Sequence, residues 1–283
     1  MSLDFIPTVW AGRLLTALQG SLVYAQTGVA NRDYDGEVRS GGDTVKIASI
    51  GDVVIDNYTK DSDISDPEVL TDEEQTLVID QQKYFNFYVD SVDRAQQNVN
   101  VLDEAMRRAG WQLRDKADAF LAGLMDAAVT GGNTIGTLST PIVPTKTTAY
   151  EYLVDLSVLL DESNVPLEGR FVVVPAWFHG LLLKDSRFVS SGTPAGDRTL
   201  HNGQVGEAAG FSILRSNNVP NASGEKYRII AGHAMATSYV EQVLDVQTYK
   251  PEKRFGDAVK GLHVYGGKVV RPSCLAMLIA SKS

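Results

Sequence analysis

Acidic side chains crowd the segment from residue 60 to residue 74, which resembles a chemical site more than any other part of the chain. It holds seven acids and one lysine, a net charge of −6, while the whole chain carries −9. Asp61 and Asp63 stand at alternate positions, like the first ligands of an EF-hand calcium loop. Asp66 stands where that loop needs glycine, and Asp72 where a bidentate glutamate is usual. We predict no such calcium site, although loose surface binding of divalent ions stays open.

Side chains that could act as nucleophiles, bases or metal ligands elsewhere are isolated from one another. No histidines have the H-x-x-x-H or H-E-x-x-H spacing, and the chain has no G-x-S-x-G, G-x-x-x-x-G-K-[ST] or G-x-G-x-x-G motif. The single cysteine, Cys274, is expected to be a small buried side chain. The histidines, each expected to be satisfied within the fold, are His179, His201, His233 and His263. We predict no catalytic residue, cofactor or metal, and no enzyme activity.

The composition is that of a folded protein with an acidic balance. The chain has 283 residues, 43% of them hydrophobic, enough for one large domain or two interleaved ones. Asp4 stands where a signal peptide needs basic residues, and no apolar run approaches the roughly 20 residues that cross a bilayer. We therefore expect a protein made and kept in a cytoplasm, without a membrane partner. Its acidity argues against a protein that grips phosphates.

The acidic segment lies between two stretches with strand character. Residues 44–58 are rich in β-branched side chains, and residues 75–90 alternate apolar and polar positions. We predict two strands of about 15 residues that form a long hairpin with the acids at its tip. Each arm would extend roughly 50 Å. Because a two-stranded ribbon is marginal in water, this hairpin needs a surface to lie on, which can belong to a neighbouring subunit.

A long helix is expected over residues 99–129. Apolar or small side chains recur there at intervals of three and four, Asn98 or Asn100 can cap its start, and Gly131 with Gly132 stops it. Its length would be roughly 45 Å. The cations of this helix lie mainly off the apolar stripe, which is typical of a solvated face. They are Arg107, Arg108, Arg114 and Lys116.

The rest of the chain mixes helix and strand signals without a repeat. Thr148 and Glu151 form a capping-box pattern, which opens a helix with Leu153, Leu156 and Leu160 on one face. Strand-like runs such as RFVVVP, GFSILRS and YRIIAGH follow, with a helix-like AWFHGLLLKD between the first two. The residues before Asp35 are expected to form an arm with one helix. The predicted fold class is α+β.

Taken together, these elements resemble the major capsid protein family of tailed bacteriophages. NRDYDGEVRSGGDTVKI and LVIDQQKYFNFYVDSVDRAQ resemble the entry and return of that family's extended loop. LDEAMRRAGWQLRDKADAFLAGL resembles its spine helix. NVPLEGRFVVVPAWFHGLLLKD, VGEAAGFSILRSNNVP and VYGGKVVRP are similar to stretches of its axial domain and C-terminal region. The pieces cover most of the chain in the family's order.

The resemblance implies the phage capsid fold and a role as a major capsid protein. Hexamers and pentamers of the subunit would close into an icosahedral shell around double-stranded DNA, with the extended loop lying over a neighbouring subunit. Assembly would take place in the cytoplasm of the host bacterium, and the subunit would end in the virion. The implied divisions are an N-terminal arm (1–34), an extended loop (35–90), a peripheral domain (91–140 and 240–265) and an axial domain (141–239 and 266–283).

The resemblance also implies partners. These are further copies of the chain, a portal protein, and packaged DNA that is contacted weakly and non-specifically. Some members carry an N-terminal scaffolding segment that has no counterpart here, because the arm begins almost at Met1. Either a separate scaffolding protein is needed or the chain is a processed form, and the initiator-like Met1 favours the separate protein. Some members join their loops by Lys–Asn cross-links; Lys60 lies near the tip but no acceptor can be nominated, so no cross-link is predicted. The runner-up function is an encapsulin-like nanocompartment shell around cargo enzymes, and the third is an enzyme with an unrecognised site.

The acidic tip is the predicted contact between subunits. The tip residues are Asp61, Asp63, Asp66, Glu68, Glu73 and Glu74. The basic residues expected to receive them are Lys250, Lys253 and Arg254, followed by Arg107, Arg108 and Arg114. Exposed ion pairs contribute only about 0 to 1 kcal/mol each, so this contact would set register and salt sensitivity more than stability. The alternative is a solvated tip that keeps subunits soluble before assembly.

Overall fold

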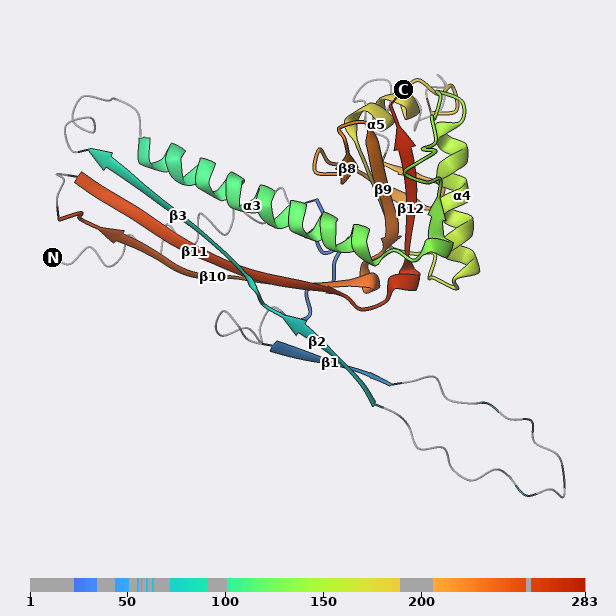
Figure 1. Cartoon of the computed structure of the whole chain (residues 1–283), viewed down its shortest axis with the longest axis horizontal. Helices are drawn as coiled ribbons and strands as arrows, with labels where there is room; N and C mark the ends of the chain where they lie inside the picture. The colour runs from blue at the N-terminus through green and yellow to red at the C-terminus, as the bar shows by residue number, and fades with distance from the viewer. Residues whose placement is uncertain are drawn as a thin grey trace.

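The computed structural model of the chain describes residues 23–34, 44–50, 72–90, 101–188, 206–252 and 256–282, with residues 55, 57, 60 and 63. Its elements form three parts (Figure 1). A long three-stranded sheet carries one long helix, a seven-stranded sheet lies at one end of it, and a two-stranded hairpin projects away from both. The predicted α+β class is confirmed. No helix in these ranges is both long and apolar enough to span a membrane.

The long sheet is antiparallel, in the order β10, β11, β3. Its strands are β3 (Gln81–Asp90), β10 (Thr237–Tyr249) and β11 (Gly256–Val269). Helix α3 (Val101–Ala128) lies along one face (Figure 1), so the long helix predicted from the sequence is confirmed. Met106 and Leu113 of α3 pack with Val246 and Val259 of the sheet. This apolar seam holds the helix on the sheet.

The second sheet is mixed. Six of its strands follow the order β4, β12, β9, β5, β7, β6, and β8 pairs with β9. The strands are β4 (Thr134–Ile135), β5 (Arg170–Val174), β6 (Glu207–Ala208), β7 (Phe211–Arg215), β8 (Asn221–Ala222), β9 (Lys226–His233) and β12 (Leu275–Ser281). Every residue of β5 and β12 is buried, which explains their unbroken apolar runs. Cys274, just before β12, is buried as predicted.

Two helices and three short 3-10 turns complete this part. They are α4 (Ala149–Glu162), α5 (Ala176–Leu182), η2 (Gly131–Asn133), η3 (Ala234–Ala236) and η4 (Pro272–Cys274). The predicted apolar face of α4 is confirmed, because Leu153, Leu156 and Leu160 are fully buried. The predicted capping box is wrong. The Thr148 hydroxyl makes no cap to the helix and accepts instead from the backbone N–H of Thr145 at 2.9 Å.

A buried arginine fastens the loop between α4 and β5. The Arg170 side chain is fully buried. It donates to the carbonyl oxygens of Pro166 at 2.8 Å and Val165 at 2.6 Å, and to Asp161 Oδ1 at 2.7 Å. Its remaining nitrogen reaches the Ser157 hydroxyl at 3.2 Å. A buried guanidinium is tolerated only when it is paired and hydrogen-bonded in this way, so Arg170 fixes where β5 begins relative to α4.

The hairpin is shorter than the sequence predicts. β1 (Thr44–Ile50) pairs antiparallel with β2 (Asp72–Val78), and the chain then enters β3, which pairs with β11. The prediction that residues 81–90 continue the hairpin is therefore wrong. Phe85 and Phe87, whose alternation suggested the hairpin arm, pack in the cluster between α3 and the long sheet. Alternation predicts that a segment is a strand, but it does not select the partner strand.

The base of the hairpin packs on the face of the long sheet opposite α3 (Figure 1). Leu77 of β2 is fully buried in a cluster with Val240 and Val264. Gly266 of β11 allows this close approach. A Cβ atom at that glycine would lie 2.5 Å from the carbonyl oxygen of Val78. The hairpin is thus anchored at its base by apolar packing, while its other end leads away from the body.

Residues 23–34 form turns against α3 and β10. Asp118 of α3 accepts hydrogen bonds from the backbone N–H groups of Val23 at 2.9 Å and Tyr24 at 2.7 Å. Asn31 forms a parallel bridge with Ser238 of β10. The helix predicted within the N-terminal arm falls on residues outside the described ranges. Residues 23–34 are therefore turns held in place by the Asp118 carboxylate of α3 and by the bridge to β10.

We expect Gly266→Ala to destabilise the fold by about 1 to 3 kcal/mol, because its new methyl group would overlap backbone atoms at the hairpin base. The matched control is Gly123→Ala on α3, where a Cβ atom meets nothing within 4 Å. That control should gain about 0.5 to 1 kcal/mol from helix propensity. Urea unfolding of both variants measures the difference. Equal stability of the two variants would contradict the close packing of hairpin and sheet.

Candidate intersubunit surfaces

The end of the hairpin is the most exposed feature of the described chain. Ile55, beyond the paired strands, is 94% exposed, and Lys60 and Asp63 are exposed as well. Glu73 and Glu74 belong to β2, where they stand opposite Ser49 and Ala48 of β1. The other predicted tip acids, Asp61, Asp66 and Glu68, lie outside the described residues. The acidic segment therefore joins the two strands at the end of the hairpin that is remote from its buried base.

The predicted cations of α3 are partly engaged within their own helix. Arg107 pairs with Glu104, and the Nε of Arg108 lies 3.0 Å from the same carboxylate. The hydrogen bond from Arg108 is the main reason that the pKa of Glu104 lies below its usual value. Partial burial lowers the pKa of Arg114, against the opposing charges of Asp118 and Asp115. Arg107 and Arg108 remain exposed and could contact another subunit, but both already contact the Glu104 carboxylate.

The other predicted receiving site lies at the turn between β10 and β11. Lys250 is exposed there, whereas Lys253 and Arg254 are outside the described residues. The structure adds a neighbouring cation that sequence reasoning missed, because Lys260 of β11 reaches over the ring of Tyr249, 5.6 Å from its centroid. The Tyr249 hydroxyl donates to Asn86 Oδ1 at 3.2 Å. These contacts bring β3, β10 and β11 side chains together on the face away from α3.

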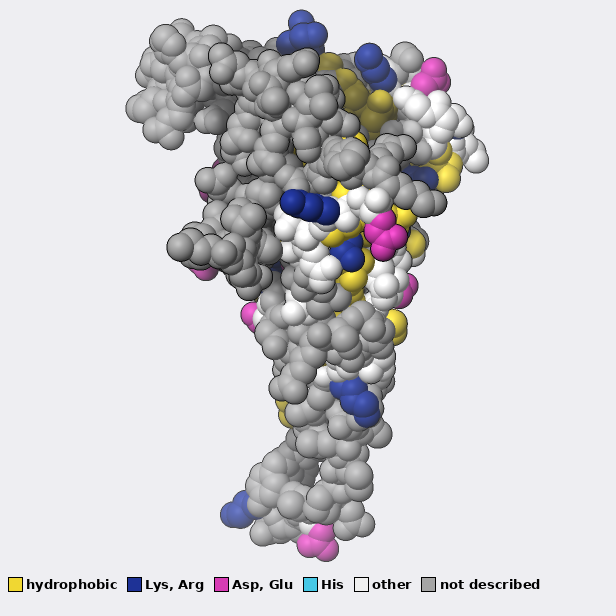
Figure 2. Space-filling model, turned by 90° about the vertical axis from the view of Figure 1, so that its left-hand side faces the viewer, with side chains coloured by type: hydrophobic (Ala, Val, Ile, Leu, Met, Phe, Trp, Pro, Cys, Tyr) yellow, Lys and Arg dark blue, Asp and Glu magenta, His cyan; other side chains and the backbone are white. Residues whose placement is uncertain are grey.

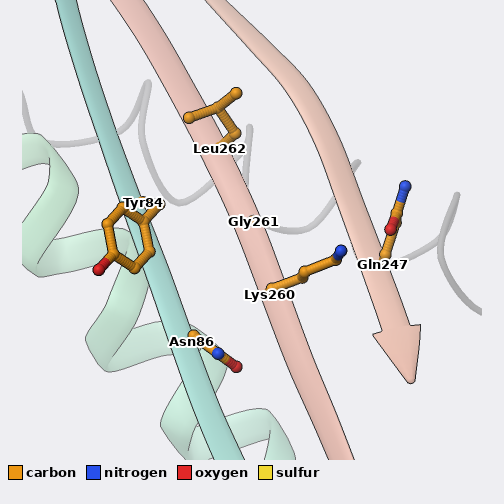
Figure 3. Close-up of a pocket in the computed structure, with 6 residues that line it drawn as sticks. All are labelled: Tyr84, Asn86, Gln247, Lys260, Gly261 and Leu262. Atoms are coloured by element: carbon orange, nitrogen blue, oxygen red, sulfur yellow. The ribbon is translucent and has the colours of Figure 1, made fainter. Parts of the chain in front are cut away.

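That face is hollowed in its outer half (Figure 3). A depression of about 380 Å³ is lined by Tyr84, Asn86, Gln247, Lys260, Gly261 and Leu262. Figure 3 shows the Lys260 side chain extending across the sheet toward Gln247. Tyr84 is 78% exposed, an unusual state for so large a ring. The hairpin base covers the inner half of the same face, and the described residues leave the outer half uncovered.

Charged side chains are scattered on the visible surface. On the face in Figure 2, the described Lys and Arg side chains lie apart, with acidic and hydrophobic side chains among them. This arrangement offers no continuous basic stripe of the kind that tracks a phosphate backbone. Within the described ranges, no three His, Cys, Asp or Glu side chains converge as metal ligands.

A buried polar cluster ties residues 23–34 to the long sheet. Arg32 pairs with Glu241 and lies over the Tyr239 ring, 5.2 Å from its centroid. The Tyr239 hydroxyl donates to Glu241 Oε2 at 2.9 Å, and His263 Nε2 lies 3.4 Å from the same oxygen. The prediction that every histidine is satisfied is wrong for His263, whose buried ring nitrogens make no hydrogen bond among the described residues. The cluster is mostly buried, with Arg32 and Glu241 17% and 9% exposed, and it fixes residues 23–34 on the long sheet.

The other described histidines differ from His263. His233 satisfies both ring nitrogens, because Nδ1 accepts from the Met235 N–H at 3.2 Å and Nε2 lies 2.9 Å from the Glu168 carbonyl oxygen. His179 of α5 is buried, and burial lowers its pKa, helped by the charge of Arg215. His201 lies outside the described residues. Neither His233 nor His179 lies in a converging group of possible metal ligands among the described residues.

The chain is similar over most of its length to solved capsid structures. A chain from Mycobacterium phage Che8 is 30% identical, with a TM-score of 0.75 and 91% of each chain covered. A capsid chain of cyanophage P-SCSP1u is 18% identical, with a TM-score of 0.67 and 87% of this chain and 85% of that one covered. A chain of the holo-SrpI encapsulin complex from Synechococcus elongatus PCC 7942 is 13% identical, with a TM-score of 0.55 and 87% of this chain and 85% of that one covered. The last two likenesses show the fold alone. No curated protein matches.

The fold defines a shell-forming capsid protein, and the resemblance seen in the sequence is confirmed. The family model described as phage capsid protein matches residues 73–278, and the chain belongs to that family. The matched range includes the long sheet, α3 and the seven-stranded sheet except the last residues of β12. Membership identifies a structural protein of the virion capsid rather than an enzyme.

We expect Glu241→Gln to weaken the fold by about 1 to 3 kcal/mol at neutral pH, because Arg32 then loses a buried charged partner. Burial acts to raise the pKa of Glu241, but the nearby His263 and Arg32 outweigh it and hold the pKa below its ordinary value of 4.5. Stability from this carboxylate is therefore present above pH 4.5 and lost as pH falls through the lowered pKa.

The measurement is urea unfolding of both proteins from neutral to acidic pH. The difference in unfolding free energy between wild type and Glu241→Gln should shrink as the pH falls below 4.5. A difference that stays constant down to the acid limit of folding would show that the cluster does not lower the pKa of Glu241.

Proposed function

We propose that the chain is the major capsid protein of a tailed phage, assembling through hexamers and pentamers into an icosahedral shell around double-stranded DNA. The observation that carries this proposal is the family match combined with likeness to the Che8 chain over nine tenths of both chains. A separate scaffolding protein would guide assembly in the host cytoplasm, and a portal protein would occupy one vertex.

Within this role the chain divides as its elements suggest. Residues 1–34 are the N-terminal arm, 35–80 the extended loop, 91–140 with 240–265 the peripheral domain, and the remainder from 141 onward the axial domain. We assign residues 81–90 to the peripheral sheet, because β3 pairs with β11 along its whole length. The expectation from sequence placed them in the loop, which extended to residue 90.

The packaged DNA would be contacted weakly. The chain is acidic overall, at −9, and on the face seen in Figure 2 the described cations lie apart, so few phosphates could be neutralised at one place there. A shell that must fill and later empty benefits from that weakness. Tight binding of DNA by purified subunits at physiological salt would count against this part of the proposal.

An encapsulin-like shell around cargo enzymes is the second candidate. It is favoured by likeness to the SrpI encapsulin complex and to a virus-like particle from Pyrococcus furiosus, which matches 98% of this chain with a TM-score of 0.55 at 14% identity. Neighbouring genes discriminate the two functions. Portal and terminase genes support the phage shell, whereas a gene for a ferritin-like or peroxidase cargo supports the nanocompartment.

The intersubunit contact is proposed at the acidic tip. Its carboxylates, in the segment 60–74, would meet basic side chains of a neighbouring copy. The turn between β10 and β11, with Lys250, Lys253 and Arg254, is the first receiving site, and the α3 cations Arg107, Arg108 and Arg114 are the second. In the opposing interpretation the tip stays solvated and serves only to keep subunits soluble.

Self-assembly is tested by imaging the purified protein in negative stain. We expect closed shells or ring-shaped capsomers, because a chain of this family presents its loop for another copy. A protein that remains strictly monomeric at high concentration, with and without added scaffold, would overturn the proposed function.

The tip contact is tested by the double variant Lys253→Glu with Arg254→Glu. It should reduce shell yield severalfold at low salt while the subunit stays folded by circular dichroism, because two attractions become repulsions. The control is Lys146→Glu with Lys184→Glu, two exposed lysines of the part built on the seven-stranded sheet. Equal yields from both double variants would rule out the turn as receiving site.

A further inference from the structure

A hollow between α3 and β3 gathers positive charge. It has a volume of about 680 Å³, and its lining holds Lys83 of β3, Arg108 and Lys116 of α3, and no acidic residue. Lys83 lies two residues before Phe85, so both side chains project from the sheet face on which α3 packs. The cations therefore stand on both walls of the hollow, which we call the basic groove.

Two acids of α3 flank Lys116 in the sequence, but both are engaged by other segments. Asp115 Oδ1 accepts a hydrogen bond from Asn218 Nδ2 at 2.9 Å. Asp118 Oδ1 accepts from the backbone N–H groups of residues 23 and 24, at 2.9 and 2.7 Å. Lys116 is exposed and forms no ion pair with a described residue. Its charge is therefore available to a ligand in the groove.

The other two cations of the groove differ in how far they are neutralised. Lys83 is exposed and, within the described ranges, forms no ion pair. Arg108 is exposed too, but its Nε lies 3.0 Å from Glu104, which offsets part of its charge. The groove therefore presents the full charges of its two lysines and part of the charge of its arginine.

We propose that the basic groove binds the phosphate backbone of duplex DNA and is a place where the subunit touches the packaged genome. This inference deepens the proposed function and rests on it for the source of the DNA. Gln82, Gln112 and Tyr84 add neutral polar side chains to the lining, of the kind that hydrogen-bond to phosphate oxygens. Cations with such donors among them attract phosphates without reading the bases.

The spacing of the cations suits a polymer of phosphates. Arg108 and Lys116 are eight residues apart on α3, about 12 Å along the helix axis. One DNA strand advances about 3.4 Å per phosphate, so this distance spans about three to four phosphates. Duplex DNA carries one charge per about 1.7 Å of its axis, whereas an extended acidic peptide carries at most one per about 3.3 Å. DNA is therefore the partner with the denser charge.

The groove stays accessible while the hairpin is in place. The hairpin base packs on the sheet face opposite α3 (Figure 1), so it does not cover the groove. DNA in the groove and the hairpin would lie on opposite sides of the long sheet. A site with so few cations also holds DNA weakly once salt is added, because only a few counterions are released on binding.

The test measures how DNA binding by dissociated full-length subunits depends on salt. Fluorescence anisotropy follows a labelled duplex of about 20 base pairs between about 50 and 200 mM salt. With three cations engaged, the slope of log K against log salt should be about −2.7, which is about a 40-fold loss of affinity over this range. Lys83→Gln with Lys116→Gln should leave a slope of about −0.9, a loss of only about threefold to fourfold.

The matched control removes the same charge elsewhere. Lys146→Gln with Lys184→Gln changes two exposed lysines of the part built on the seven-stranded sheet, and it should keep the wild-type slope. Equal slopes for the groove variant and this control would overturn the inference. A wild-type subunit that does not bind the duplex even at the lowest salt would overturn it as well.

Circular dichroism shows whether the variants fold. If the double groove variant does not, the single variants Lys83→Gln and Lys116→Gln take its place. Each should make the slope shallower by about 0.9, because one phosphate contact is lost. Slopes that stay at the wild-type value in both single variants would refute the groove as the site.

Two competitors identify the source of the phosphate. Inorganic phosphate at constant ionic strength should not displace the duplex, because a single phosphate carries no condensed counterions. Poly-glutamate at equal charge concentration should compete roughly tenfold less well than unlabelled duplex, because its charge is less dense. Displacement by phosphate would assign the groove to a small anion, and equal competition by poly-glutamate to an acidic protein; either result would overturn the assignment to DNA.

Negative-stain imaging of the same protein separates this inference from the proposed function. Shells from a chain whose DNA binding does not depend on the groove would overturn the inference alone. Groove-dependent DNA binding by a chain that forms neither shells nor capsomers would overturn the proposed function, and with it the packaged genome as the source of the DNA.

Discussion

The packing of α3 along the long sheet is the interaction on which the rest of the structure depends. Phe120 meets Tyr265 edge-on at 5.5 Å, and Gly267 makes room for Leu121 and Leu124, which would lie 3.1 and 3.3 Å from a Cβ atom there. A 28-residue helix is roughly 42 Å long, so this one seam stiffens the whole length of the sheet. Leu121 also belongs to the large core cluster that includes the seven-stranded sheet. One helix therefore joins the two parts of the subunit, and it leaves the opposite face of the long sheet for the hairpin.

Charged side chains in or beside the core are paired with opposite charges, whereas those at the periphery are concentrated by sign. Inside, Arg170 meets Asp161, Arg32 meets Glu241 and Arg228 meets Asp126, each pair lying within or beside the core. These pairs are costly to break but add little net stability, so their main effect is to fix geometry. Outside, acids concentrate in residues 60–74, and exposed cations such as Lys83 and Lys116 lie on β3 and α3. A subunit with this separation of charge is suited to meeting another copy of itself in a defined orientation.

Sequence reasoning succeeded where a single element carried its own signal. Long helical periodicity predicted α3, and the short apolar run RFVVVP predicted β5, whose residues are all buried. It failed at Thr148, whose hydroxyl accepts a hydrogen bond from the backbone N–H of Thr145 in the preceding turn and does not cap the helix. The expected hydrogen bonds of His263 were also wrong, because nothing local shows that its ring is buried beside Glu241, 22 positions earlier. The cation Lys260 was missed, because its contact with Tyr249 exists only after β10 and β11 have paired.

The sequence by itself determined the class of this protein: an α+β chain with a spine helix, an acidic loop and no catalytic constellation. These properties follow from composition and from periodicity within one element, which local chemistry specifies. The tertiary structure alone decided that residues 81–90 leave the hairpin and become the last strand of the long sheet. That pairing depends on residues more than a hundred positions apart, such as Phe85 and Gly261, which stand opposite each other. No local pattern encodes such a contact, because an alternating strand satisfies its backbone equally well beside several possible partners.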